Sequence, residues 1–188
     1  MNTDKCHVMI DLETLSRHSN AAILSVGAVL FGLEPRDEPE ELYHMGVDLK
    51  TAMDAGLHIE SDTINWWLNQ KSENQDRLLA MQRKSLYTVL EELATLVKRH
   101  TTKCYVWGHG SIFDITILEN AYKAIRKEIF WDYKNVRDTR TFFDVCEYTY
   151  KAKGGHDALD DAMNQAVGVR EAYKQLFGYV EYLEGGEK

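Results

Sequence analysis

The 188-residue sequence contains little proline and little cysteine, with two prolines and three cysteines. So few prolines argue against a proline-rich or collagen-like chain. The cysteines (Cys6, Cys104 and Cys146) are widely spaced and form no Cys-x-x-Cys pair, which gives no support to a zinc ribbon or a thioredoxin-like redox site. Because an odd number of cysteines without a disulfide framework suits a reducing cytosol, we expect a cytoplasmic protein.

The sequence also lacks a long hydrophobic run and an excess of basic residues. Its apolar runs are too short for a membrane span or a signal peptide, so no membrane contact is expected. It has 22 Lys and Arg against 30 Asp and Glu, a net charge of −8, which argues against a basic protein that coats DNA. An acidic total does not exclude a nucleic-acid enzyme, because metal-binding carboxylates are themselves acidic and local basic patches can hold phosphates.

The pattern of apolar residues predicts one α/β domain. Apolar runs with short links predict an antiparallel meander of three strands at 7–12, 22–31 and 42–49. A fourth strand is predicted at 103–107 and a short extended piece at 130–133. Helical spacing of apolar residues predicts helices at 63–70, 86–97, 114–125, 139–150 and 158–176. We expect a mixed sheet flanked by helices, in a single domain over 1–188 with a core at about 7–177 and a tail at 178–188.

Two carboxylates end the first predicted strand. Asp11 and Glu13 are two residues apart, and on a strand this spacing places both side chains on the same face. Carboxylates held together raise each other's pKa unless a cation lies between them. For this pair alone, a polar strand end that faces water is an equally good interpretation.

A third carboxylate, Asp114, follows the fourth predicted strand and a glycine-rich turn at 107–110. It is therefore expected at the carboxyl end of a strand, where α/β sheets commonly have their ligand sites. An aspartate that only caps the following helix is the alternative, and for this residue alone it is the favoured one.

A histidine and an acidic cluster begin the last predicted helix, after two glycines. The macrodipole of a helix favours acidic residues in its first turn, which accounts for Asp157, Asp160 and Asp161. The dipole gives no reason for His156, so this segment needs a second explanation.

Together, these motifs resemble those of the DEDD superfamily of 3′–5′ exonucleases, in the branch that carries a histidine. The resemblance covers about 7–173 and implies a ribonuclease H-like fold, in which three antiparallel strands are followed by parallel strands. The sequence is most similar to the small exoribonuclease-like proteins of mycobacteria and to the exonuclease A type of T4-like phages. The segments that carry this likeness are 9–15 (MIDLETL), 22–27 (AILSVG), 63–67 (TINWW), 137–141 (RDTRT) and 156–161 (HDALDD).

The resemblance implies a metal site and a general base. Its implied ligands for two Mg²⁺ ions, which Mn²⁺ can replace, are Asp11, Glu13, Asp114 and Asp161. Two hard divalent ions about 3.5–4 Å apart activate the attacking water and stabilise the leaving 3′ oxygen. His156 is implied as the base that takes the proton from that water. A second branch of the superfamily has a tyrosine four residues before the last aspartate, where this sequence has Asp157.

Six further residues are candidates for contacts with the substrate: Leu12, Thr14, Leu15, Trp66, His109 and Asp138. The first three are implied by the resemblance, in which this stretch contacts the terminal nucleotide. Trp66 can stack on a base, whereas Trp67 shares a helix face with apolar residues and is expected in the core.

Two of these candidates carry an open question. His109 stands where relatives more often have asparagine, so its contact with the substrate is left open. Asp138 can orient an arginine of the 137–141 segment that reaches phosphate, it can support the site, or it can simply begin a helix.

We therefore predict a metal-dependent 3′–5′ exonuclease that releases nucleoside 5′-monophosphates from single-stranded nucleic acid with a free 3′ end. The mycobacterial likeness favours RNA and the phage likeness favours DNA, and a phage protein would act in the host cytoplasm. The alternative is a catalytically idle module on the same fold that binds nucleic acid or protein. An endonuclease or strand-transfer enzyme would not need the His-x-Ala-x-x-Asp motif.

Relatives of this kind are often homodimers. Trp131, Tyr133 and the aromatic residues of 177–182 are candidates for an interface or for a cover over the core.

Overall fold

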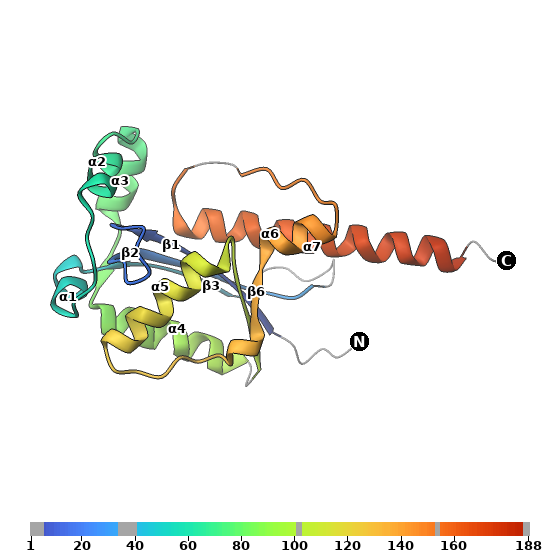
Figure 1. Cartoon of the computed structure of the whole chain (residues 1–188), viewed down its shortest axis with the longest axis horizontal. Helices are drawn as coiled ribbons and strands as arrows, with labels where there is room; N and C mark the ends of the chain where they lie inside the picture. Colours follow the sequence, from blue (N-terminus) through green and yellow to red (C-terminus); the bar gives the residue numbers. More distant parts are fainter. Residues whose placement is uncertain (1–5, 34–40, 101–102, 153–154, 186–188) are drawn as a thin grey trace.

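The computed structural model describes residues 6–33, 41–100, 103–152 and 155–185, with side chains up to residue 177. A six-stranded mixed sheet forms its centre (Figure 1). The strands are β1 (Cys6–Thr14), β2 (Ile23–Phe31), β3 (Glu41–Val47), β4 (Arg83–Lys84), β5 (Cys104–Gly108) and β6 (Val136–Asp138).

The strands lie in the order β4-β3-β2-β1-β5-β6. β1, β2 and β3 pair antiparallel, and β5 then pairs parallel to β1 and to β6. The short β4 adds a parallel pair at the other edge, beside β3. This arrangement confirms the predicted sheet of three antiparallel strands followed by parallel strands.

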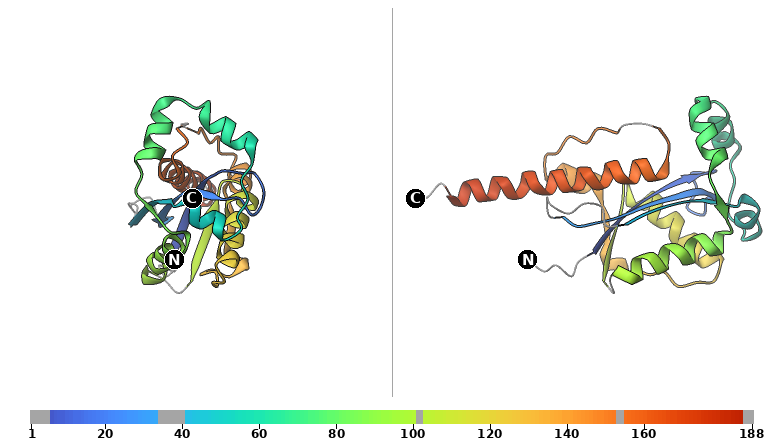
Figure 2. Two further views of the ribbon diagram at one scale, coloured as in Figure 1. Left: turned by 90° about the vertical axis from the view of Figure 1, so that its left-hand side faces the viewer. Right: turned by 180° about the vertical axis from the view of Figure 1, so that it is seen from behind.

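Helices cover both faces of the sheet. They are α1 (Leu49–Asp54), α2 (Ser61–Leu68), α3 (Ser72–Ala80), α4 (Leu86–His100), α5 (Ser111–Ala124), α6 (Thr139–Val145) and α7 (Ala158–Gly185), with a 3₁₀ turn at Tyr133–Asn135. Helices α4 and α5 pack on one face, and α6 and α7 pack on the other (Figures 1 and 2). In the described part of the chain, no helix is both long enough and apolar enough to span a membrane.

The alternation of side chains along β1 directs its carboxylates toward α7. Val8 and Ile10 enter the core beneath α4 and α5, whereas Met9 packs in the core beneath α6 and α7. Since successive residues of a strand point to opposite faces, Asp11 and Glu13 follow Met9 onto the α7 face. The first strand continues two residues beyond its predicted end, which keeps both carboxylates within regular structure.

Several element boundaries differ from those predicted. Helix α5 begins at Ser111, because Gly110 turns the chain with a φ of 92° directly before it. Helix α6 ends at Val145 rather than 150, just before Glu147 with a φ of 52°. The extended piece expected at 130–133 forms no strand, and β6 begins at 136 instead. Helix α7 continues beyond the predicted 176 as far as Gly185.

Helices α2 and α3 form an arm over residues 61–80 that stands next to the start of α7 (Figures 1 and 2). The cap position of α2 is Glu60, and Asp62 lies in the first turn. The guanidinium of Arg77 on α3 lies 3.2 Å from the carboxylate of Asp160 on α7. The arm therefore contacts the start of α7, at the end of the sheet where β1 ends.

Candidate active site

Three carboxylates converge between β1 and the first turn of α7. One oxygen atom from each of Asp11, Glu13 and Asp161 lies within 4.8 Å of the other two. The two side chains from β1 share a face, and α7 packs across that face. Carboxylate oxygens at this spacing are the donors that Mg²⁺ and Mn²⁺ prefer, so the set fits a divalent cation.

The fourth predicted ligand, Asp114, lies in the first turn of α5 and is 4% exposed. Its Oδ1 accepts a hydrogen bond from the backbone N–H of Leu12, at 3.3 Å. Burial raises the pKa of Asp114, and the charge of Asp11 raises it further. Asp114 therefore lies beside Asp11, although its oxygens are outside the set of three that converge.

Burial and mutual repulsion favour the protonated form of these acids. Burial raises the pKa of Asp11 to about 7, with further increases from Asp161 and Asp157 and an opposing hydrogen bond from Gln165. Burial also raises the pKa of Glu13 to about 9, and the charge of Asp11 adds to the effect. A bound divalent cation reverses this balance, because it attracts the charged form of each carboxylate.

Gln165 is a neighbour of the carboxylates that the sequence motifs do not include. Its Nε2 donates a hydrogen bond to Asp11 Oδ1 at 2.7 Å, and the side chain is 4% exposed. It lies four residues after Asp161, so the helical repeat places both on the same face of α7. This spacing is the signal that would have identified it. The hydrogen bond fixes the orientation of the Asp11 carboxylate.

His156 precedes α7 at the edge of the carboxylate group. Its φ is 50°, in the left-handed region, and its ring is exposed. Its charge lowers the pKa of Asp161, against the larger upward effect of burial, so it lies near that carboxylate. Asp157, at the position of the tyrosine in the other branch, accepts the backbone N–H groups of Leu159 and Asp160, both at 3.1 Å, and so caps α7.

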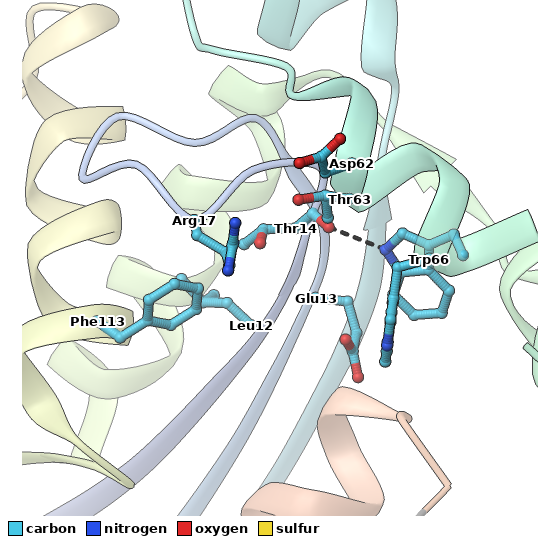
Figure 3. Close-up of a pocket in the computed structure, with 9 residues that line it drawn as sticks. Leu12, Glu13, Thr14, Arg17, Asp62, Thr63, Trp66 and Phe113 are labelled. Atoms are coloured by element: carbon cyan, nitrogen blue, oxygen red, sulfur yellow. Dashed lines mark hydrogen bonds between the residues drawn. The ribbon is translucent and has the colours of Figure 1, made fainter. Parts of the chain in front are cut away.

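A pocket of about 460 Å³ opens next to Glu13 (Figure 3). Its lining residues come from β1, the loop after it, the α2–α3 arm and α5: Leu12, Glu13, Thr14, Arg17, Asp62, Thr63, Trp66, Trp67 and Phe113. Trp66 faces Leu12 and Phe113 across the pocket. The pocket thus includes three of the predicted contact residues, Leu12, Thr14 and Trp66.

The two tryptophans of α2 have different environments. Trp66 is 42% exposed, whereas Trp67 is 6% exposed. The indole N–H of Trp67 donates to the carbonyl oxygen of Thr14 at 2.9 Å. Trp67 is therefore a core residue, as predicted, and it fastens α2 to the end of β1.

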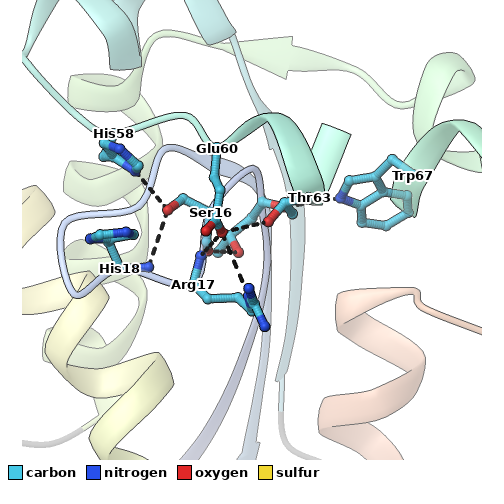
Figure 4. Close-up of polar contacts among 8 residues, drawn as sticks. Ser16, Arg17, His18, His58, Glu60, Thr63 and Trp67 are labelled. Carbon is cyan, nitrogen blue, oxygen red and sulfur yellow. Dashed lines mark hydrogen bonds and ion pairs between the residues drawn. The ribbon is translucent and has the colours of Figure 1, made fainter. Parts of the chain in front are cut away.

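Arg17 lines the pocket without having been expected there, and a network of polar contacts holds its loop (Figure 4). Glu60 accepts the backbone N–H of Arg17 at 3.3 Å and pairs with its guanidinium at 3.5 Å. Ser16 Oγ and His58 Nδ1 are hydrogen-bonded at 2.8 Å on the other side of the same loop. The guanidinium of Arg17 thus lies at the wall of the pocket, paired with Glu60.

Three predicted contact residues lie outside this pocket. Leu15 is buried in the core beneath α4 and α5. His109 shares a 2.7 Å hydrogen bond with Thr139 Oγ1, and its pKa is lowered by burial and then by Arg140. Asp138 caps α6 and accepts the backbone N–H of Ser111 at 2.6 Å. Asp138 therefore holds the first turn of α5, the turn that carries Asp114.

Metal removal is expected to make stability fall as the pH rises from about 5 to 9. Without metal, Glu13 and Asp11 keep in the folded state a proton that the unfolded chain releases near pH 4. A carboxyl group whose pKa is higher in the folded state than in the unfolded state stabilises the fold at a pH below its unfolded-state pKa. This contribution is lost as the pH rises through its folded-state pKa. Scanning calorimetry in EDTA should give a Tm lower by a few degrees at pH 9 than at pH 6, and Mn²⁺ should reverse the decrease. Glu13→Gln should flatten the profile, and an unchanged slope in this variant would contradict the assignment.

Comparisons with known proteins also indicate a nuclease. The family model described as the 3′-5′ exoribonuclease Rv2179c-like domain matches residues 6–173. Comparison with curated proteins gave no match. The nuclease domain of 3′hExo, a DEDDh family member solved with bound rAMP, has a TM-score of 0.55 at 15% identity, covering 88% of this chain and 90% of that one.

Two further solved structures share the fold. Escherichia coli exonuclease I, in complex with a dA16 oligonucleotide, has a TM-score of 0.62 at 13% identity, covering 93% of this chain and 43% of that one. Cell-death related nuclease 4 (CRN-4) has a TM-score of 0.55 at 12% identity, covering 88% of this chain and 62% of that one. The identities are low, so these likenesses concern the fold, whereas the family model spans nearly the whole chain. The chain therefore belongs to the 3′-5′ exoribonuclease Rv2179c-like domain family and is a 3′–5′ exonuclease.

Proposed function

We propose that the protein uses two Mg²⁺ ions to remove nucleoside 5′-monophosphates from the 3′ end of single-stranded RNA. The observation that carries this proposal is the convergence of the Asp11, Glu13 and Asp161 oxygens within 4.8 Å, next to a pocket of about 460 Å³. The family's description as an exoribonuclease domain favours RNA over DNA. The exonuclease I structure holds a DNA oligonucleotide on the same fold, so DNA is a substrate to be tested beside it.

Four carboxylates are the proposed ligands of the ions. Asp11, Glu13 and Asp161 are the proposed first ligands, and Asp114, which lies beside them, would complete the set. The ions, when bound, lower the pKa of the attacking water and stabilise the leaving 3′ oxygen. Gln165 donates a hydrogen bond to one oxygen of Asp11 and would so hold the orientation of this carboxylate when the ions are bound.

His156 is the proposed general base. Its segment leaves the ring exposed beside the carboxylates, where an imidazole nitrogen accepts the proton of the water. Histidine is the side chain that most often serves as a general base near neutral pH.

The pocket is the proposed site of the terminal nucleotide. Leu12, Phe113 and Trp66 offer apolar and aromatic surface to a base, and stacking of this kind tolerates every base. Arg17, Asp62 and Thr63 line the same pocket and would offer polar groups to the edge of the base or to the sugar. The 3′hExo nuclease domain, on the same fold, was solved with rAMP bound, which supports a nucleotide as the occupant.

A single cytoplasmic domain that assembles as a homodimer is part of the same proposal. The thiols of Cys104 and Cys146 are buried and belong to no disulfide, the state that a reducing compartment maintains. Trp131 is buried in the core and is therefore unavailable to a partner, whereas Tyr133 and Phe177 are exposed. Sedimentation equilibrium measures the mass of the assembly and tests the dimer.

The test of this function is a 3′-trimming assay. We expect 5′-labelled single-stranded RNA to shorten stepwise from its 3′ end with Mg²⁺ or Mn²⁺ and to stay intact with EDTA. Asp11→Asn should lower the rate by at least about 100-fold, because it removes a metal ligand. Asp54→Asn, which changes an exposed aspartate paired with Lys50, is the matched control and should leave the rate unchanged.

Two other results would change the conclusion. Cleavage of a circular single strand would identify an endonuclease, because an exonuclease needs an end. No cleavage of RNA or DNA with either metal would favour the binding module on the same fold. Matched DNA strands in the same assay compare the two sugars.

A further inference from the structure

Trp66 contacts both the pocket and the histidine at its edge. Its indole lines the pocket beside Glu13. The same indole meets the ring of His156 edge to face, with the ring centroids 4.8 Å apart and the planes at 81°. One side chain thus lies between the proposed nucleotide site and the proposed base.

His156 has few other contacts to hold its ring. The residue has a left-handed φ of 50°, and Gly155 before it has a φ of 150°. Among the described residues, no hydrogen bond to its ring is present, and its ring contacts are with Trp66 and, at 6.5 Å, Trp67. The imidazole therefore rests against the indole surface of α2, with the Asp161 carboxylate nearby.

That surface is itself well fixed. Trp66 packs against Trp67 with centroids 5.0 Å apart, and Trp67 is hydrogen-bonded to Thr14 on β1. On the far side of the arm, Arg77 pairs with Asp160 in the first turn of α7. The arm is thus joined both to β1 and to the first turn of α7, the segment that follows His156.

We propose that Trp66 is a positioning residue that couples occupancy of the nucleotide pocket to the placement of His156. A base stacked on the pocket side of the indole restricts the rotation of Trp66. The edge contact passes this restriction to the imidazole, which is then held toward the carboxylates when a nucleotide is bound. This inference rests on the proposed function, in which His156 is the base and the pocket takes the terminal nucleotide.

The first test separates positioning from binding. Trp66→Leu should lower kcat at saturating RNA by about 10-fold or more, because the imidazole loses its support, and Trp66→Phe should recover most of kcat because a ring remains. Arg77→Ala is the matched control, since it removes the other contact between the arm and α7 and should keep kcat within about 2-fold. An increase in KM with unchanged kcat in Trp66→Leu would make Trp66 a wall of the pocket only. An equal loss in Arg77→Ala would assign the effect to docking of the arm.

A second test needs no turnover. Histidine ring resonances are followed by NMR in the metal-free protein during addition of AMP to saturation, with His156→Gln to assign the signal. AMP should shift the His156 signal in the wild type and much less in Trp66→Leu, whose melting curve checks that it folds. A missing shift in the wild type, or an equal shift in both proteins, would overturn the coupling. A wild type that shows the shift but trims no RNA would instead disprove the proposed function.

Discussion

Replacing His156 with alanine is expected to lower kcat by about 10²–10⁴-fold and to change the affinity for Mn²⁺ by no more than a few-fold. The imidazole lies near Asp161, but it is exposed and belongs to no hydrogen bond among the described residues. Its loss therefore removes no part of the core and no carboxylate oxygen. The effect is confined to transfer of the proton from the attacking water.

The measurement compares rates of 3′ trimming with metal binding in the same samples. Added imidazole should restore part of the rate in His156→Ala, since a free base can enter the space left at an exposed site. His100→Ala is the matched control, because His100 pairs with Glu41 at the end of α4, away from the carboxylates. Turnover within a few-fold of the wild type would show that another group accepts the proton.

The convergence of the acidic motifs could be predicted because each one lies next to a strong local pattern. The apolar run before Asp11 predicts a strand, and strand geometry then requires Glu13 to share its face. The apolar repeat after Asp161 predicts α7. Only the resemblance to an exonuclease family indicated that these motifs meet in space, because no local sequence pattern predicts that α7 crosses the face of β1.

The walls of the pocket could not be predicted in the same way. Phe113 and Arg17 enter it from α5 and from the loop after β1, and their meeting depends on how these elements pack in three dimensions. Helix α3 has no buried residue, so it carries no apolar repeat from which a helix could be recognised. Strand β6 has three residues, too few for an alternating pattern.

Gly27 illustrates a constraint that only the structure explains. It lies on β2, paired with Asp11 on one side and with His44 on the other. A Cβ atom at this position would lie 2.1 Å from the carbonyl carbon and oxygen of Ala158 and 2.4 Å from the nitrogen of Leu159. The first turn of α7 thus rests directly on the backbone of β2, at the level of the carboxylates.

Gly27→Ala is expected to weaken Mn²⁺ binding by about 10–100-fold and to lower the rate of 3′ trimming by about 100-fold or more. The contact is with backbone atoms, which no rotamer change can move, so the start of α7 must shift by more than about 1 Å to reach an ordinary van der Waals distance. Asp161 and the segment of His156 move with it, away from Asp11 and Glu13. Calorimetric titration with Mn²⁺ measures the loss of affinity directly.

Two variants separate displacement of the site from loss of stability. Gly46→Ala on β3 brings a Cβ to 2.9 Å from the backbone oxygen of Gln82. The crowding in this variant is in the sheet, at a place distant from the carboxylates. The Gly46→Ala variant should therefore have a lower Tm and the same affinity for Mn²⁺ as the wild type. Adding Ala158→Gly to Gly27→Ala should give no recovery, because the obstructing atoms belong to the backbone and not to the methyl group of Ala158. Wild-type affinity for Mn²⁺ in Gly27→Ala would mean that α7 adjusts without moving Asp161, and the close packing of helix on strand would then have no part in building the metal site.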